Sequence, residues 1–167
     1  MANELTRVGY GQVEPNHLSA QRTGQIFAQL PAASGITTLE NGTFLKYDME
    51  AGECNFTGDG EWMLVMNEVK LYNPLYMTMK DFALVKTDFM GGAITPRLYK
   101  TNVGDIFTTN CVKQDSAGLA VVGAKLVVGT TGVLEVNNTP GTAMWFNVVK
   151  VTTMPDGQAA VKLQRIQ

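Results

Sequence analysis

The chain has 167 residues, a formal net charge of −2 and two cysteines. This length is sufficient for one domain with a full hydrophobic core, so neither a disulfide nor a structural metal is needed. Charged residues make up only 17% of the chain, against roughly 25% in an average soluble protein. Such a charge-poor surface is typical of a protein that covers part of itself with partners or with copies of itself.

The charge and hydropathy patterns argue against two kinds of partner. No cluster of lysine and arginine provides the electrostatic footprint of a nucleic-acid-binding protein. No apolar run approaches the ~20 residues that span a membrane, and the first ten residues lack the basic and apolar regions of a signal peptide. We therefore expect a protein that matures in a cytoplasm, with Cys54 and Cys111 reduced and packed.

The first 35 residues are predicted to form an extended docking arm ahead of a β domain at residues 36–167. About thirty extended residues can span up to ~100 Å, which is enough to reach a neighbouring subunit. The candidate docking residues are spread along the arm instead of forming one face: Leu5, Val8, Tyr10, Val13, His17, Leu18, Ile26, Phe27 and Leu30.

Free energies limit how such an arm can bind. Ordering about thirty residues costs at least ~30 kcal/mol, whereas the eight apolar anchors return about 12–24 kcal/mol. The arm must therefore gain backbone hydrogen bonds by adding a strand to the edge of a partner's sheet, or stay partly loose without that partner. Residues 20–30 are also compatible with a short helix, because Ile26, Phe27 and Leu30 fall at helical spacing, although Gly24 disfavours it.

From Ile36 onward the sequence is typical of β structure. Short runs rich in valine, threonine and aromatic residues alternate with glycine, asparagine, aspartate and proline. Their spacing predicts one compact all-β domain, an antiparallel barrel or sandwich. A helix over residues 74–86 is the less favoured alternative, because MTM there has a period of two. The predicted strands lie within residues 43–47, 61–72, 82–86, 94–100, 105–112, 119–128, 132–136, 143–153 and 159–166.

The last two runs predict a hairpin around MPDG, residues 154–157. Proline presets the first central turn position, aspartate caps the turn, and glycine accepts the backbone angle that other residues avoid. On the final strand Val161 and Leu163 alternate with Lys162 and Gln164. This alternation is typical of a strand that is buried on one face.

The potentially reactive side chains do not form a recognisable catalytic or metal site. His17, the single histidine, lies in an irregular polar stretch without a candidate nucleophile or orienting partner. Cys111 lies within a strand-like run, and Cys54 lies among acids that would raise its pKa. The carboxylates of residues 48–61 begin like a calcium loop, but Gly52 occupies the third ligand position. We therefore expect no catalytic residue, no bound metal and no cofactor.

The C-terminal half resembles the decoration, or cement, proteins of tailed-bacteriophage heads. The resemblance is carried by PRLYKTNVGDIFTTNCV, GAKLVVGTTGVLEV and AMWFNVVKVTTMPDGQAAVKLQRI, and upstream NGTFLKYD and GEWMLVMNEVKLYNP fit the same order. It covers residues 36–167. Such proteins coat the outside of the major capsid protein shell, and their β domain has a Gly-Asp turn before a strand.

The resemblance implies a virion structural protein that binds the phage major capsid protein and itself, as a trimer or another small homo-oligomer. We expect it on the capsid exterior after assembly in the host bacterial cytoplasm. There it would stabilise the shell by bridging major capsid protein subunits through its β domain and its N-terminal arm. The resemblance supplies no catalytic residue.

Two other functions stay open. A carbohydrate- or receptor-binding module of a phage tail fibre or tip would present exposed aromatic side chains on one face, for which Tyr72, Tyr76 and Tyr99 are candidates. Trp62 and Trp145 could line such a face, but their apolar alternating strands are more typical of core packing. An enzyme with a site shared between subunits is the third and least favoured alternative.

Overall fold

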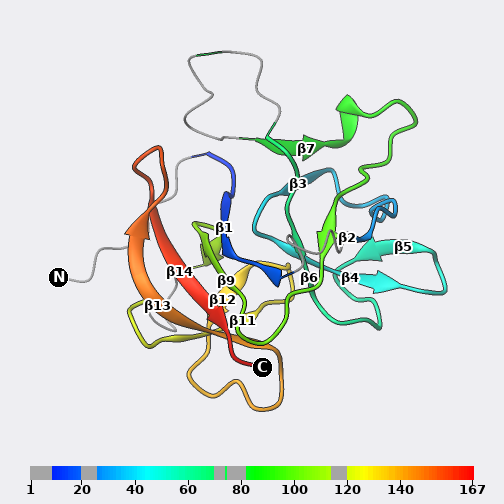
Figure 1. Ribbon diagram of the computed structural model, residues 1–167. Coiled ribbons are helices and arrows are strands. Elements are labelled where there is room, and N and C mark those ends of the chain that lie inside the picture. The colour runs from blue at the N-terminus through cyan, green and yellow to red at the C-terminus, as the bar shows by residue number, and fades with distance from the viewer. Residues whose placement is uncertain (1–8, 20–25, 70–73, 75–81, 114–119) are drawn as a thin grey trace.

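The computed structural model describes residues 9–19, 26–69, 74, 82–113 and 120–167 (Figure 1). Within these residues the regular structure consists of β-strands and one short 3-10 turn, Lys86–Asp88, so the prediction of an all-β fold is confirmed. The strands are β1 (Val13–His17), β2 (Ile26–Ala28), β3 (Thr38–Glu40), β4 (Phe44–Asp48), β5 (Glu53–Asn55), β6 (Met63–Val65), β7 (Ala83–Val85), β8 (Leu98–Tyr99), β9 (Ile106–Thr109), β10 (Val112–Lys113), β11 (Lys125–Val128), β12 (Leu134–Val136), β13 (Trp145–Thr153) and β14 (Ala159–Arg165).

The strands form three sheets. The largest has seven strands in the order β1-β9-β14-β13-β11-β12-β10, the second has five in the order β2-β8-β6-β4-β5, and the third pairs β3 with β7. Figure 1 shows the seven-stranded sheet and the five-stranded sheet beside each other. The described pairs are antiparallel, as predicted, except that β10 runs parallel to β12. The sheet is therefore mixed at this edge. In the sequence β11 comes between β10 and β12, and in the sheet β12 lies between β11 and β10.

In the five-stranded sheet, β6 and the first two residues of β4 are buried on both faces. On β4, Phe44 belongs to a first hydrophobic core and Leu45 to a second. On β6, Leu64 belongs to the first core, while Met63 and Val65 belong to the second. Because successive side chains of a strand point to opposite faces, β4 and β6 separate the two cores and contribute to each.

Three aromatic rings form the centre of the first core. The ring of Phe146 lies 5.6 Å from that of Phe44 and 5.5 Å from that of Phe107, measured between centroids. These residues come from β13, β4 and β9, so the cluster joins the seven-stranded sheet to the five-stranded sheet. All three side chains are fully buried.

The predicted hairpin is confirmed as β13–β14. The N–H of Gly157 donates to the carbonyl of Met154 (2.9 Å), and the N–H of Met154 donates to the carbonyl of Gln158 (2.7 Å). Gly157 has a φ of +86°, the left-handed angle that the turn requires and that glycine adopts without strain. The register shifts between Val148 and Lys150, which places a bulge in β13.

The described parts of the predicted arm lie within the sheets, which corrects the boundary that we predicted between residues 35 and 36. β1 pairs with β9 at the edge of the seven-stranded sheet, β2 pairs with β8, and Ala32 forms a bridge to Cys54. The segment does obtain backbone hydrogen bonds by strand pairing, but it pairs with the chain's own sheets instead of a partner's. Pro15 fits this position, because an edge strand has one side on which no N–H is needed.

The two helix alternatives are wrong where the structure describes the chain. Residues 26–28 form β2, and residues 83–85 form β7. The remaining parts of those alternatives, residues 20–25, 70–73 and 75–81, lie outside the described residues.

Replacing Phe107 with alanine is expected to lower the free energy of unfolding by about 3–5 kcal/mol, because it leaves a cavity between the other two rings. Urea denaturation followed by tryptophan fluorescence measures this change. Val103→Ala is the matched control, since Val103 is 69% exposed, and it should change stability by less than about 0.5 kcal/mol. Equal effects of the two substitutions would contradict the packing described here.

Candidate interaction surface

Where their side chains are described, most of the residues predicted to anchor the arm contact the chain's own cores. Leu18 is 2% exposed and belongs to the first core, and Val13 packs against the same core. Leu30 packs against the second core. Tyr10 and His17 are exposed, so they remain accessible to a partner. The other predicted anchors, Leu5, Val8, Ile26 and Phe27, have side chains outside the described part of the chain.

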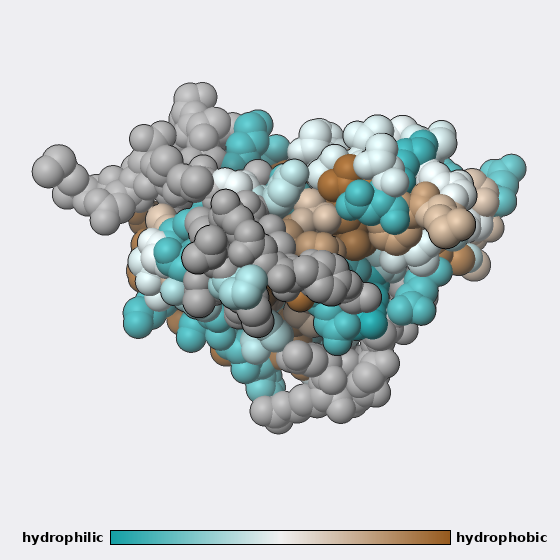
Figure 2. Space-filling model, turned by 90° about the horizontal axis from the view of Figure 1, so that it is seen from above, coloured by the Kyte–Doolittle hydropathy of each residue, from teal (hydrophilic) through white to brown (hydrophobic). Residues whose placement is uncertain are grey.

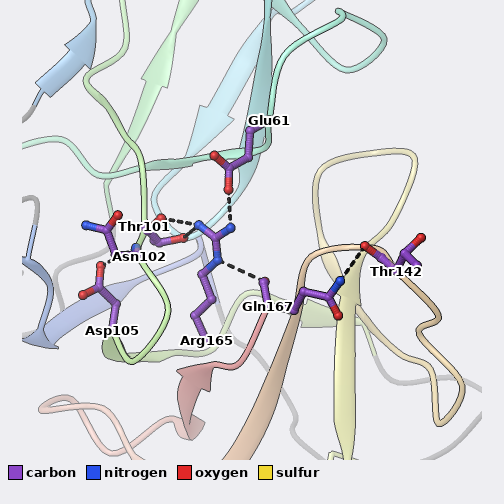
Figure 3. A network of polar contacts seen from close by, with 7 residues as sticks. All are labelled: Glu61, Thr101, Asn102, Asp105, Thr142, Arg165 and Gln167. Carbon is purple, nitrogen blue, oxygen red and sulfur yellow. Dashed lines mark hydrogen bonds and ion pairs between the residues drawn. The ribbon is translucent and has the colours of Figure 1, made fainter.

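A buried carboxylate fixes the end of the N-terminal strand. Asp105 is 2% exposed, and its Oδ1 accepts hydrogen bonds from the backbone N–H (3.0 Å) and the hydroxyl of Ser19. Its Oδ2 accepts the N–H of Asn102 (2.8 Å), as Figure 3 shows. Asp105 belongs to the predicted Gly-Asp turn, where Gly104 has a φ of +93°. This turn thus has a structural role in holding Ser19.

Arg165 joins the last strand to the five-stranded sheet (Figure 3). Its guanidinium forms an ion pair with Glu61 and donates to the carbonyl and the hydroxyl of Thr101. Its Nε donates to the carbonyl of Gln167 (3.0 Å), whose side-chain amide donates to the carbonyl of Thr142 (3.0 Å). Glu61 belongs to the carboxylate-rich stretch that resembled a calcium loop, and here it has an arginine partner.

A second polar network holds the start of β1 against the β13–β14 turn. Gln12 is buried, and its side-chain amide donates to Oδ2 of Asp156 (2.7 Å). Its backbone N–H donates to Oδ1 of Asn110 (2.6 Å), and its carbonyl accepts the hydroxyl of Thr109 (2.6 Å). Partial burial acts to raise the pKa of Asp156, but the hydrogen bonds from Gln12 and Gln158 outweigh it and lower the pKa. This contribution to stability is present above the ordinary aspartate pKa and is lost as the pH falls through the lowered value.

The sequence offers two thiols as candidate reactive groups. Cys54 and Cys111 are buried, and neither is joined in a disulfide. Burial, followed by the charge of Glu53, raises the pKa of Cys54 to about 11, which agrees with the direction predicted from its acidic neighbours. Among the described residues no group of three histidine, cysteine, aspartate or glutamate side chains could hold a metal ion.

Two grooves lie between the sheets. One of about 560 Å³ is lined by β7 and Phe89, and another of about 420 Å³ by β1 and Tyr99. They share Asn67, Glu68 and Arg97. The Arg97 guanidinium lies 3.9 Å from the Glu68 carboxylate, so the groove charges largely compensate each other.

The tryptophans and tyrosines do not form one exposed aromatic face in the described residues. Trp62 packs against the first core, with Lys46 Nζ 4.9 Å from its ring centre. Trp145 is half-buried on β13, with Lys125 Nζ at 5.3 Å. Tyr99 is 8% exposed, so it is not available to a sugar as the alternative function requires. Tyr72 and Tyr76 lie outside the described residues.

Exposed apolar side chains gather near the bulge of β13. Val149 and Val151 are exposed there, and Val121 and Val122 are exposed in the adjacent turn. The backbone joins the two segments, because the N–H of Gly123 donates to the carbonyl of Val148 (2.8 Å). Val151 is the register partner of Val161, whose side chain is in the first core, so Val151 leaves the opposite face of the strand from Lys150. We call the other three residues, Val121, Val122 and Val149, the valine patch. Figure 2 shows hydrophilic and hydrophobic residues interspersed on the face of the molecule that it draws.

No protein-family model, curated protein or solved structure matches this chain, so no relative supplies a function for it. The described part of the chain contains no helix with the length and apolar character needed to cross a membrane.

Both thiols are expected to be unreactive in the folded protein at pH 8. With a pKa of about 11 for Cys54, only about one such thiol in a thousand is ionised there, and burial blocks access to both. DTNB should therefore modify no cysteine in buffer and two per chain in urea. Rapid modification of one equivalent in the native protein would contradict this environment.

Asp105→Asn is expected to destabilise the protein by about 1–3 kcal/mol, because an NH₂ group then replaces an oxygen that accepts buried donors. Chemical denaturation measures the loss. Asp59→Asn is the control, since Asp59 is exposed, and its effect should stay within about 0.5 kcal/mol. If Asp105→Asn left the free energy of unfolding unchanged, the contacts with Ser19 and Asn102 would contribute nothing to stability.

Proposed function

We propose that this protein is a virion structural protein that binds the outer surface of a tailed-bacteriophage capsid and stabilises the shell. It bridges subunits of the major capsid protein, and it associates with copies of itself in a small homo-oligomer. The sequence resemblance to decoration proteins motivates this proposal, and the all-β fold is compatible with it.

The single observation that carries the proposal is the valine patch. Three exposed valines, Val121, Val122 and Val149, lie in two segments that a backbone hydrogen bond joins, and exposed apolar side chains next to polar ones are found at protein interaction sites. The patch lies on a rigid support, because β13 pairs with β14 along its length and Phe146 on the same strand lies in the first core.

The structure changes the part that the N-terminal segment plays in this proposal. Residues 9–19 and 26–35 complete the chain's own sheets, so the folded body supplies the main contact surface. Tyr10 and His17 remain exposed at its edge. On a lattice, linked copies raise the effective concentration of their neighbours, so each contact can be small.

Trp145 favours a second candidate, the carbohydrate-binding module. Its indole is half-buried on the sheet surface beside Lys125, and an aromatic ring next to a cation can stack against a sugar. Binding of the isolated protein to a glycan array, abolished by Trp145→Ala, would favour this alternative over the capsid.

Mixing the purified protein with phage heads that lack it tests the main proposal. The protein is expected to co-sediment with the heads at saturable stoichiometry and to appear on their exterior in electron micrographs. Val122→Asp should weaken binding at least about tenfold, because an unpaired charge would be buried in the interface. Val103→Asp is the control, since that valine is exposed outside the valine patch. Failure of the unmodified protein to bind heads would overturn the proposal.

A further inference from the structure

Two lysines lie directly opposite each other on the hairpin. Lys150 of β13 is the register partner of Lys162 of β14, so both side chains leave the same face of the sheet. Lys162 is flanked by Val161 and Leu163, which belong to the first core. The lysine pair therefore points away from that core, onto the outer face of the seven-stranded sheet. Lys150 is exposed and Lys162 is half-buried.

This arrangement is unfavourable for the isolated molecule. Like charges directly opposite each other on neighbouring strands repel, whereas opposite charges in the same positions attract. Across the sheet from Lys162, the next register partners are Thr108 on β9 and then Glu14 on β1. The strand β9 therefore separates Lys162 from the Glu14 carboxylate. The register thus places no carboxylate directly beside the two lysines on a neighbouring strand.

The rest of the outer face does not reverse the sign of the charge. Glu135 is 3.5 Å from Lys113, which balances it. Lys125 is on the same face as the lysine pair. Its register partner Asn147 is paired with Gln164, which is two residues from Lys162 on β14 and so points to the same side. The described strands therefore place four lysines and two glutamates on this face, although the whole chain has a net charge of −2.

The surroundings of the lysine pair indicate the class of partner. Val149, the extra residue of the bulge and a member of the valine patch, directly precedes Lys150, so an exposed apolar side chain lies next to the two cations. Protein interfaces combine an apolar centre with a polar rim in this way. A nucleic acid would require a longer row of cations to follow its phosphates, and a sugar would use Trp145 instead of the valines.

We propose that the Lys150–Lys162 pair, with the valine patch, docks a carboxylate-bearing surface of a partner protein. This inference rests on the proposed function only in identifying that partner as the major capsid protein. A carboxylate placed between the two ammonium groups removes their repulsion, so docking relieves a cost that the free protein carries. The contact is electrostatic at its rim and is weakened by salt.

The test compares Lys162→Glu with Lys86→Glu, which makes the same charge change on the 3-10 turn after β7. Each protein is measured for its urea unfolding midpoint, for binding to immobilised poly-L-glutamate at low and high salt, and for co-sedimentation with heads that lack the protein. Lys162→Glu should raise the unfolding midpoint, because it creates an opposite-charge pair with Lys150. It should weaken both kinds of binding about tenfold at low salt, the direction expected when like charges meet across an interface. Lys86→Glu should leave both affinities within about twofold.

The outcomes separate this inference from the proposed function. If poly-L-glutamate binding depends on Lys162 but no protein binds heads, the docking site stands and the capsid function fails. If heads are bound equally by the unmodified protein and by Lys162→Glu, and poly-L-glutamate binding is also unchanged, the capsid function stands and the docking site is overturned. A purely structural role of the lysines would change the unfolding midpoint without changing either affinity.

Discussion

Burial of β6 and of the start of β4 on both faces is the constraint on which the rest of this structure depends. Phe44 and Leu64 face one core while Leu45, Met63 and Val65 face the other, so β6 and the first two positions of β4 must be apolar in succession. A strand with a polar outer face could not occupy this position, because each of its alternate side chains would be buried without a partner. The seven-stranded sheet on one side and the pair β3–β7 on the other then follow as covers for these two faces.

Polar side chains connect the covers to this centre at a few defined points. Arg165 reaches Glu61 and Thr101, Asp105 holds Ser19 and Asn102, and Gln12 meets Asp156. Each network joins segments that are far apart in the sequence, and each involves a charged group that is at least partly buried. Charge-assisted hydrogen bonds of this kind are stronger than neutral ones, so they fix the relative positions of strands whose own pairings are short. Such contacts between distant segments suit a protein whose proposed work is contact and not chemistry.

Local features of the fold were predictable from the sequence, and distant pairings were not. The turn at residues 154–157 and the alternation of Val161, Lys162 and Leu163 identified β13–β14, because the residues that decide a hairpin are adjacent. The position of residues 13–17 was missed, since their partners 106–109 lie about ninety residues away and nothing local distinguishes a strand that joins its own sheet from one that joins a partner's. Pro15 was a usable sign of an edge strand. The lysine pair could not be predicted from the sequence either. The alternation places Lys162 on the outer face of β14 but does not show which residue of β13 lies opposite it.

The place of β14 within its sheet has a consequence for how the protein is made. Although β14 follows every other described strand in the sequence, it lies between β9 and β13 in the sheet, and β9 in turn supports β1. During synthesis, residues 13–17 and 106–109 have therefore been translated long before the strand that anchors them to β13 leaves the ribosome. Their apolar faces must wait, exposed or shielded by chaperones, until residues 159–165 emerge. The sheet is therefore completed late, when segments that were translated at very different times pair with one another.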